Sequence, residues 1–406
     1  MTVPLNKLCK LIVDCPHSTA PDEGTGYPLI RTPNIGKGFF DLEGVHRVSE
    51  PTYNKRNARA IPQDGDLILA REAPAGNVAI IQNGRKFCLG QRTVLVRPDP
   101  EKVNPLWLNY YLNAPEQQHA LLKNANGATV SHVNMPIIRN LPINRPDDTS
   151  QRRIAGILSA YDELIENNRK QIKLLEEAAQ RLYKEWFIDF KFPGHETTHI
   201  DSAMGLPMGW ENTNLLPLID YIRGQSYSAV NLVADGPMNL INLNNIQAWG
   251  GWNAGAEKPY EGKCKKEQCA MSGDILMAVT DMTMERRLVG HVARVPNHLN
   301  GGVFSMDLIK LVPKKLNTSY LYALLRYSGV AEVISLLANG TNVLHLKPDA
   351  LSRIEVLVPD DGVQDSFADI IAPMLEKDDL LEVQIAAAQE ARDRLLPKLM
   401  SAEIEV

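Results

Sequence analysis

A long heptad pattern in the middle of the chain constrains the fold more than any other feature. Between Gln151 and Gly194, apolar residues recur at alternating steps of four and three, and Asn168 is the one polar residue on this seam. The apolar seam positions are Ile154, Leu158, Tyr161, Ile165, Ile172, Leu175, Ala179, Leu182 and Trp186. Four such heptads predict a helix of roughly 55 Å, which needs a partner helix to cover its apolar side.

The partner helix is encoded in the same chain. Residues 364–396 repeat the first heptad segment at a constant offset of 213 residues. This copy is poorer, because Asp378 and Arg392 replace apolar seam residues and Pro373 predicts a kink or a restart. Any two amphipathic helices look somewhat alike, but a single ungapped register favours a true internal repeat. The identities in that register include Gln151/Gln364, Gln171/Gln384, Glu177/Glu390 and Arg181/Arg394.

The segments before the two helices are also related. Asp64-Gly65-Asp66, which opens a predicted strand 67–71, matches Ser272-Gly273-Asp274, and the Gly-containing loop 126–133 matches 339–346. The sequence therefore predicts an α+β protein with the order globule, helix, globule, helix. We expect domains at 1–147, 148–192, 193–360 and 361–406. Antiparallel pairing of the helices as a coiled coil would relate the globules by a pseudo-two-fold axis. Parallel pairing would require the second globule to loop back along the rod.

Local patterns in the first globule predict strands at 78–82, 86–89 and 93–97. Asn83-Gly84 is typical of a tight turn and predicts a hairpin between the first two of these strands. Residues 105–123 have helical spacing.

Composition and charge limit the class of protein. At 406 residues, with 44% apolar and 22% charged residues, the chain predicts two or three globular domains. No apolar run is long enough to span a bilayer, and the five cysteines lack zinc-site spacing, so we expect a cytoplasmic protein without a metal. The net charge of −5 is concentrated at the C-terminus: residues 361–406 carry 11 acidic and 4 basic groups, whereas residues 1–150 carry 17 basic and 14 acidic groups. A DNA partner is therefore permitted.

Catalytic motifs do not support an enzymatic function. The sequence has no phosphate-binding loop, no dinucleotide-binding glycine motif and no His-Glu-x-x-His motif. Asn104-Pro105-Leu106-Trp107 lacks the second proline of the amino-methyltransferase motif and is typical of a helix cap. Asp235 with Glu261 and Lys263 has nuclease-like spacing that often arises by chance. We therefore expect a recognition protein that is not itself an enzyme.

Three segments resemble the central conserved region of specificity subunits of type I restriction-modification enzymes. They are Asp162 to Asn168, Leu174 to Gln180, and Trp186 to Gly194. Leu395 to Ser401 resembles the conserved C-terminal end of that family, although Ala402 stands where the family usually has glycine. The resemblance covers the full chain and implies two target-recognition domains, each followed by a long helix.

The same resemblance implies function and partners. Each recognition domain would read half of a bipartite site in double-stranded DNA, and the helices would set the unspecified gap. Two adenine methyltransferase subunits would bind the helices, and up to two restriction subunits would join them. No cofactor is expected in this chain, because S-adenosylmethionine, ATP and Mg would be bound by the partner subunits. The competing hypothesis is a coiled-coil scaffold that joins two protein-binding domains without touching DNA.

Candidate DNA contacts follow from side-chain chemistry and from the repeated loop. Bidentate donors suit purines and phosphates, and exposed cations suit phosphates. The candidates are Arg71, Lys86, Gln91, Arg92, Asn126, Thr129, Ser131, His132, Lys265, Lys266, Arg286, Arg287, Asn339, Thr341, Asn342 and His345. For the glycine loops a purely structural turn is an equal alternative.

Charged residues on the outer face of the first helix are candidates for partner binding. They are Glu166, Arg169, Lys173, Glu176 and Glu177, and a solvated face is the alternative. On the seam, antiparallel pairing centred on residues 166 and 167 would place Asn168 opposite Asp378. We then expect the amide to donate to the carboxylate and to fix the register.

Overall fold

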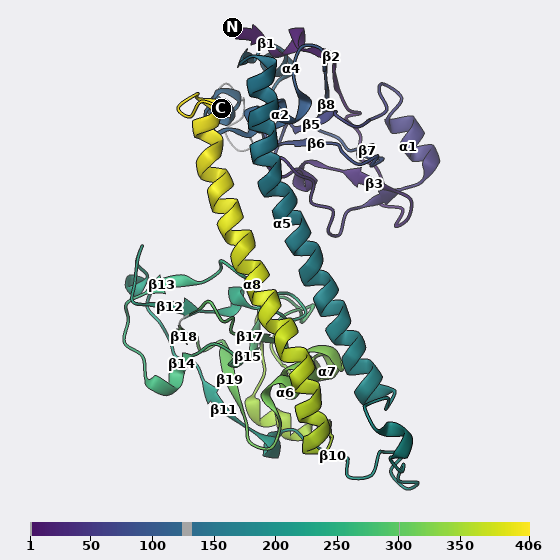
Figure 1. Ribbon diagram of the computed structural model, residues 1–406, viewed down its shortest axis with the longest axis vertical. Helices are drawn as coiled ribbons and strands as arrows, with labels where there is room; N and C mark the ends of the chain where they lie inside the picture. The colour runs from purple at the N-terminus through teal and green to yellow at the C-terminus, as the bar shows by residue number, and fades with distance from the viewer. Residues whose placement is uncertain (1, 124–131, 300) are drawn as a thin grey trace. The chain divides into compact units, whose positions relative to one another are not determined.

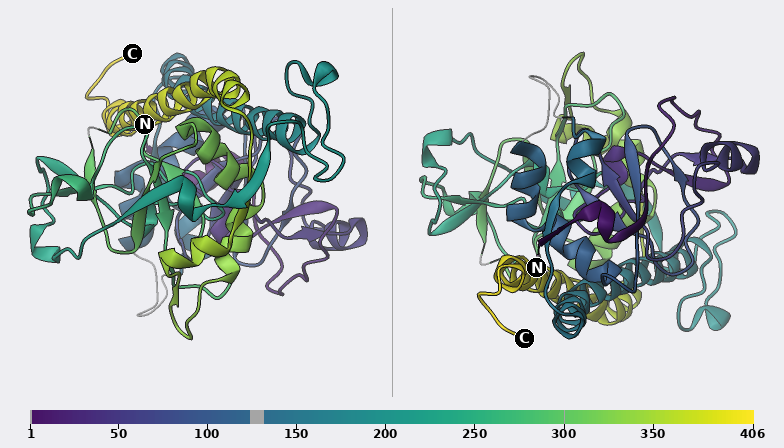
Figure 2. Two further views of the ribbon diagram at one scale, coloured as in Figure 1. Left: turned by 90° about the horizontal axis from the view of Figure 1, so that it is seen from below. Right: turned by 90° about the horizontal axis from the view of Figure 1, so that it is seen from above.

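The computed structural model describes residues 2–123, 132–299 and 301–406. Its contacts divide the chain into two compact units (Figure 1). Unit 1 consists of Met1–Ile165 together with Ala387–Val406, and unit 2 is the continuous segment Glu166–Ala386. Helices α5 (Asp148–Tyr183) and α8 (Asp361–Met400) therefore each contribute to both units. Both chain ends lie in unit 1 (Figure 2).

The part of unit 1 that precedes α5 is built from short strands and short helices. The strands are β1 Thr2–Pro4, β2 Cys9–Asp14, β3 Tyr27–Ile30, β4 Arg47–Val48, β5 Leu67–Ala70, β6 Val78–Ile80, β7 Cys88–Leu89, β8 Thr93–Pro98 and β9 Pro142–Asn144. The helices are α1 Glu50–Arg56, α2 Pro105–Asn113, α3 Pro115–Lys123 and α4 Met135–Arg139. Together they confirm a mixed α and β fold.

The central sheet of unit 1, in the order β2-β8-β5-β6, is covered on both faces. Alternate residues of a strand point to opposite faces, and here both sets are buried. Leu67 and Leu69 join the core that contains α2 and the ends of α5 and α8, whereas Ile68 and Ala70 face a second core toward the small sheet β4-β3-β7. A strand buried on both faces reads as a continuous apolar run.

Unit 2 repeats this construction. Its strands are β10 Glu211–Asn214, β11 Ile219–Arg223, β12 Met238–Ile241, β13 Lys258–Tyr260, β14 Cys269–Ala270, β15 Ile275–Ala278, β16 Thr280–Asp281, β17 Val292–Arg294, β18 Gly302–Phe304, β19 Leu308–Pro313, β20 Leu344–His345 and β21 Glu355–Val358. Its further helices are α6 Thr318–Tyr327 and α7 Val330–Leu336, and a π-helical turn, Lys184–Ile188, ends α5.

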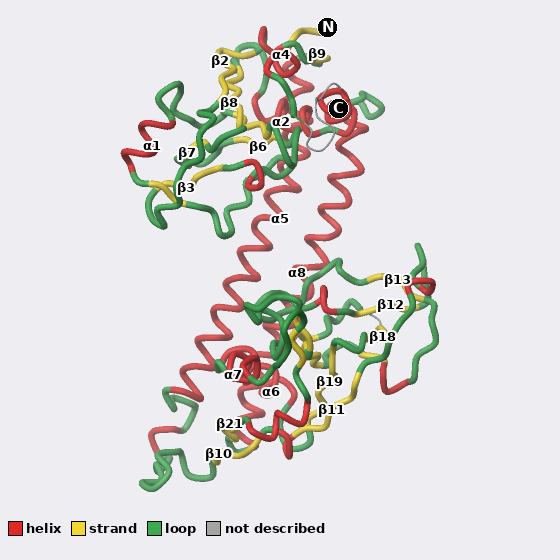
Figure 3. Tube along the Cα trace, turned by 180° about the vertical axis from the view of Figure 1, so that it is seen from behind, coloured by secondary structure: helices red, strands yellow, loops and turns green. Residues whose placement is uncertain are grey.

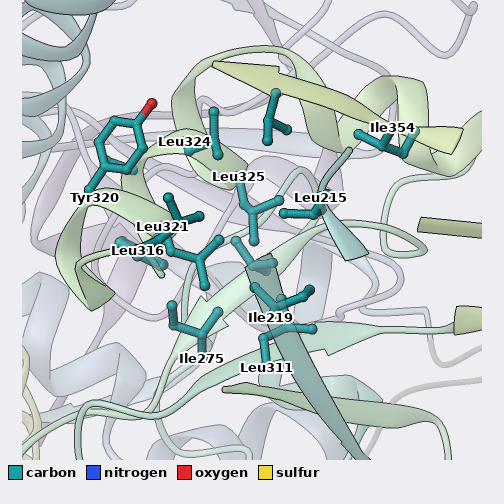
Figure 4. Packing of buried hydrophobic residues seen from close by; sticks show 14 of the residues in the cluster. Leu215, Ile219, Ile275, Leu311, Leu316, Tyr320, Leu321, Leu324, Leu325 and Ile354 are labelled. Atoms are coloured by element: carbon teal, nitrogen blue, oxygen red, sulfur yellow. The ribbon is translucent and has the colours of Figure 1, made fainter. Parts of the chain in front are cut away.

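The sheet β11-β19-β15-β17 separates two cores of unit 2. Ile275 and Leu311 pack toward α6, where Tyr320 and Leu324 lie (Figure 4). Leu276 faces the opposite core, which it shares with the second sheet β13-β12-β18-β14. Figure 3 shows that second sheet on the side of unit 2 away from α6 and α7.

Two buried glutamines confirm the internal repeat at the level of single hydrogen bonds. Gln151 donates from Nε2 to the carbonyl oxygen of Pro146 (2.9 Å) and accepts at Oε1 from the amide of Asn104 (2.9 Å). In unit 2, Gln364 makes the same bonds with Pro359 (2.8 Å) and Asn317 (2.9 Å). Each glutamine thus fixes the base of a long helix to the loop that caps a domain helix.

The long helices run antiparallel within each unit. In unit 2, the ring of Tyr183 lies 6.3 Å from that of Phe367, and Asn168 donates from Nδ2 to Oε1 of Gln384 (3.1 Å). In unit 1, Arg392 donates from Nη1 to Oδ1 of Asp162 (2.6 Å), which balances its charge on the seam. Supercoiling and a pseudo-two-fold axis stay predictions.

The predicted Asn168–Asp378 pair is wrong. Asn168 meets Gln384, six residues farther along α8, and Oδ1 of Asp378 is buried without a hydrogen-bond partner. A heptad seam repeats itself, so a shift of nearly one heptad keeps most apolar residues in contact. The physical cause of the error is therefore the ambiguity of register.

Three local expectations are also corrected. The Asn83-Gly84 turn forms, but β6 pairs with β5 while β7 pairs in parallel with β3, so no hairpin joins β6 to β7. The helix predicted at 105–123 breaks before Pro115, because a residue preceding proline favours an extended backbone. Helix α8 runs unbroken through Pro373, which lies on an exposed face where water can solvate the freed carbonyl oxygen.

Candidate nucleic-acid interface

In unit 1, a chain of polar contacts joins three segments at the end of β5. Arg71 donates from Nε to the carbonyl oxygen of Val133 (3.0 Å), and its Nη2 lies 2.7 Å from Nε2 of His132. Nδ1 of His132 lies 2.9 Å from Oε1 of Glu72, whose other oxygen pairs with Arg92. Because Arg71 can only donate, Nε2 of His132 accepts its hydrogen bond, and the N–H at Nδ1 donates a hydrogen bond to Glu72.

A second carboxylate extends this group. Asp14 accepts from Nη1 of Arg59 (2.6 Å), lies 3.0 Å from Nε2 of His17 and stands 4.0 Å from Nη1 of Arg71. We call the seven residues the His132 cluster: Asp14, His17, Arg59, Arg71, Glu72, Arg92 and His132. The cluster contains three arginines and two carboxylates, so its formal charge is positive even when the histidines are not counted.

Exposure separates the supporting side chains from those that reach solvent. Arg71 is only 8% exposed, so it holds His132 in place and is neither a free phosphate contact nor plain surface charge. Arg92 and Arg59 are each 53% exposed, and His17 is 65% exposed. Sequence reasoning missed Arg59 and His17, because nothing in their local pattern links them to Arg92.

Other unit 1 candidates lie apart from the cluster or on its border. Gln91 is partly buried and accepts from the hydroxyl of Thr19 (3.3 Å), and Lys86 is exposed near the Asn83-Gly84 turn. The predicted contacts Asn126, Thr129 and Ser131 lie outside the described residues.

Unit 2 builds the equivalent site on the same backbone scaffold. The amide of Leu346 donates to the carbonyl oxygen of Val279 (2.8 Å), as the amide of Val133 donates to that of Arg71 (3.0 Å) in unit 1. The ladder between β16 and β20 pairs Thr280 with His345. The loops 282–287 and 339–345 therefore lie side by side.

The loop 282–287 is held by one buried carboxylate. Asp281 accepts from the amides of Thr283 (2.8 Å) and Leu288 (2.7 Å) and from the hydroxyl of Thr283 (2.8 Å). Burial alone would raise the pKa of Asp281, but these bonds outweigh it and lower the pKa. Arg286 adds a second anchor, because it donates from Nη1 to the carbonyl oxygens of Ser335 (2.6 Å) and Ala338 (3.1 Å).

The loop 339–345 is closed by a pair of backbone bonds. The amide of Asn339 donates to the carbonyl oxygen of His345 (3.0 Å), and the reverse bond measures 2.9 Å. A Cβ on Gly340 would lie 1.9 Å from the carbonyl oxygen of Val343, so only glycine fits there. Thr341, Asn342 and the His345 side chain are exposed at this closed loop.

Most candidate DNA contacts of unit 2 therefore lie on the loops 282–287 and 339–345, and two lysines lie elsewhere. Arg287 is exposed and pairs with Glu285 in the loop 282–287. Met282 (76% exposed) and Met284 (61% exposed) share its loop and were missed, because methionine usually indicates a core position. Lys265 and Lys266 are exposed on a 3-10 turn that precedes β14 in the second sheet.

Of the partner-binding candidates on α5, one turns toward its own domain. Glu176 pairs with Arg326 of α6. Glu166 lies 3.0 Å from Lys170, and Lys173 lies 4.0 Å from Glu177, so these charges balance along the helix. Arg169 is exposed, and so is Leu174, at 63%.

The described residues contain no group of three His, Cys, Asp or Glu side chains arranged to hold a metal ion. Within the same ranges, no helix is both long enough and apolar enough to cross a membrane.

Several known proteins are similar to this chain. The family model for the type I restriction modification DNA specificity domain matches residues 2–177. The type I restriction enzyme MjaIX specificity subunit of Methanocaldococcus jannaschii is 25% identical over 91% of this chain and 84% of its own length. The MjaVIII specificity subunit of the same organism is 22% identical over 86% of this chain and 81% of its own.

A solved structure supports the fold. The S subunit of a type I restriction-modification system from M. genitalium aligns with a TM-score of 0.61, covering 98% of this chain and 95% of its own, at 15% identity. At that identity the likeness concerns the fold alone.

Proposed function

We propose that this chain, which is similar to specificity subunits of type I restriction-modification enzymes, acts as such a subunit and reads a bipartite DNA target. One half-site would be read by the His132 cluster of unit 1, and the other by the paired loops of unit 2. The observation that carries this proposal is the shared scaffold with different side chains. Val279 and Thr280 of unit 2 occupy the places of Arg71 and Glu72 in unit 1. The two units therefore place different side chains on the same backbone arrangement.

Each site offers chemistry that suits DNA. Exposed guanidinium groups such as those of Arg92 and Arg287 can bind guanine edges or phosphates in a bidentate manner. The amide of Asn342 suits adenine, and the exposed methionines suit the thymine methyl group or a widened groove. Lys86, Lys265 and Lys266 would contribute charge to backbone binding without selecting bases.

The chain would act with catalytic subunits and carry no catalysis of its own. Two methyltransferase subunits would bind S-adenosylmethionine and methylate adenine, and up to two restriction subunits would use ATP and Mg. The exposed residues of α5, among them Arg169 and Leu174, are the surface we assign to partner subunits. In this proposal Glu176 holds Arg326 of α6 and is left out of the partner surface.

Mapping methylated adenines tests the proposal. The chain is expressed with its methyltransferase partners, and the methylome is compared among wild type, Arg92→Gln and Asn342→Ala. Each variant is the control for the other. We expect Arg92→Gln to relax or abolish one half-site only and Asn342→Ala the other half-site only. If the methylated motif were not bipartite, or if neither variant changed it, the alternative of a coiled-coil scaffold that does not touch DNA would be preferred.

A further inference from the structure

Two cysteines of unit 2 lie unusually close together at a sharp turn. The Sγ atoms of Cys264 and Cys269 are 2.8 Å apart, and both thiols are free. The four residues between them, Lys265 to Gln268, include the two exposed lysines and a 3-10 turn. A disulfide needs a sulfur separation of about 2.05 Å, so only a small movement separates these thiols from a bond.

The turn is anchored at both ends, which keeps the thiols together. Gln225 donates from Nε2 to the carbonyl oxygen of Lys263 (2.9 Å), and Gln268 donates from Nε2 to that of Arg223 (3.2 Å). Lys310 donates from Nζ to the carbonyl oxygen of Cys269 (3.0 Å). Because these contacts already order the loop, closing it covalently costs little further entropy.

A metal site fits this geometry less well. Two thiolates on one tetrahedral zinc, at about 2.3 Å each, stand roughly 3.8 Å apart, which is wider than the observed separation. A further sulfur, Sδ of Met238, lies 3.9 Å from Sγ of Cys264. In the described ranges, no His, Asp or Glu completes a set of three ligands around the pair.

We propose that Cys264 and Cys269 are an oxidation site that forms a reversible disulfide within the turn. With hydrogen peroxide as oxidant, one thiol takes up an oxygen atom to become a sulfenic acid, and water leaves. The second sulfur attacks the first, the S–S bond forms, and the hydroxyl departs with the proton of the second thiol as another water. Each sulfur loses one electron, and a dithiol such as dithiothreitol restores both thiols.

The environment of Cys269 sets the pace of this reaction. Burial, and then the neighbouring Cys264 thiol, raise the pKa of Cys269 to about 11. A protonated thiol is a poor nucleophile, so closure is slow at neutral pH and faster at pH 9. The closed ring would hold the ammonium groups of Lys265 and Lys266 on one rigid turn.

Peptide mapping of the full chain tests the proposal. The protein is treated with dilute hydrogen peroxide, its remaining thiols are alkylated, and trypsin is added. Trypsin cuts after Lys265 and Lys266, between the two cysteines, so a disulfide leaves two peptides joined by one bond. We expect this joined species, lighter by two hydrogens than its reduced parts, and its loss on reduction. Cys9, Cys15 and Cys88 serve as internal references that remain available for alkylation in the denatured chain.

Two variants sharpen the result. Cys269→Ser should abolish the joined peptides, whereas Cys9→Ser, in unit 1, should leave them unchanged. The inference is overturned if wild-type Cys264 and Cys269 are both alkylated after oxidation. It is also overturned if the purified chain retains one equivalent of zinc or copper that Cys269→Ser loses. DNA binding does not enter this test, so its outcome is independent of the proposed function.

Discussion

Asn168 donates from its side-chain amide to Oε1 of Gln384 across 3.1 Å, from a position on the buried seam to an exposed one on the neighbouring helix. Asn168 is only 2% exposed, so the bond places a polar group where the heptad pattern calls for an apolar one. It therefore marks the register of α5 and α8 within unit 2.

Replacing Asn168 by leucine tests the cost of that bond. One hydrogen bond worth about 1 kcal/mol is lost, whereas a buried leucine side chain contributes about 2 kcal/mol. Because Gln384 can bond to water, Asn168→Leu should raise the free energy of unfolding by about 1 kcal/mol. Chemical denaturation measures the change, with Asn167→Leu on the exposed face as the control. A lower stability would mean that the amide bond outweighs apolar packing here.

Replacing each of two adjacent carboxylates of α8 by asparagine should change the stability at pH 8 in opposite directions. Burial raises the pKa of Asp378 to about 7, and Glu382, Asp379 and Glu176 add to the rise. Its folded pKa exceeds the unfolded value of about 3.9, so the folded state binds more protons between pH 4 and 7. Stability from this group is therefore present at low pH and is lost as the pH rises through 7. Asp378→Asn should stabilise unit 2 at pH 8, by on the order of 1–3 kcal/mol, and hardly change it at pH 4.

Asp379 is the matched control. It accepts from Nη2 of Arg294 (2.5 Å) and from the amide of Asn297 (3.0 Å). Asp379→Asn leaves the largely buried charge of Arg294 without its partner and should destabilise unit 2 by about 3 kcal/mol at pH 8. Thermal unfolding of both variants at pH 4 and pH 8 measures these effects. Equal changes in the two variants would contradict the roles assigned to the two carboxylates.

The matching glutamines should behave alike in the two units. Gln151→Ala and Gln364→Ala each remove the two hydrogen bonds to backbone groups and leave these partly buried groups unpaired, at a cost of about 1–3 kcal/mol per group. Hydrogen exchange of amides in unit 1 and unit 2 reports each loss separately. If the two variants lost clearly different amounts of stability, the matching hydrogen bonds would share their geometry but would not contribute equally to the stability of the two units.

Neighbouring arginines of unit 2 should separate folding from DNA binding. Arg286 tethers its loop to two carbonyl oxygens, so Arg286→Ala should lower the stability of unit 2 by about 1–3 kcal/mol. Arg287 is exposed, and Arg287→Ala should weaken binding of the target duplex by about tenfold at unchanged stability. Fluorescence anisotropy and melting curves, measured on both variants, test this separation.

The observed register allows a test of whether the helices set the spacing between the half-sites. Since Asn168 meets Gln384, the residue opposite Asn167 is Ile385, and one heptad inserted at each of these points keeps both seams in phase. Each insertion adds ~10 Å, and we expect the gap between half-sites to grow by about three base pairs at roughly 3.4 Å each. Three pairs also rotate one half-site by roughly 100°, so overall methylation should fall. Full methylation at the original gap would show that the helices do not set the spacing.

The repeat was readable from the sequence because identical residues make identical bonds. Gln151 and Gln364 occupy the same place relative to their proline and asparagine partners, and the 213-residue offset holds through both helices. The alternation of Leu67 and Ile68 between two cores was not readable, because a strand buried on both faces carries no polar period.

The candidate site was only partly predictable for a related reason. His345 and the loop 282–287 meet through a ladder of two residue pairs, too short to leave a pattern. Arg59 and Arg92 converge on Asp14 and Glu72 through tertiary contacts alone. By contrast, Gly340 indicated a tight loop in the sequence. The structure gives the reason, because the carbonyl oxygen of Val343 lies too close to leave room for any side chain.

The composition of unit 1 has a consequence for synthesis on the ribosome. Ile154 and Leu158 of α5 share their core with Leu399, which belongs to the returning segment 387–406. At about 5–20 residues per second, translation of the intervening residues takes on the order of 10–45 s. During that interval the first domain to emerge keeps an apolar helix face uncovered. The N-terminal globule is therefore the earliest to be synthesised and the last to be completed.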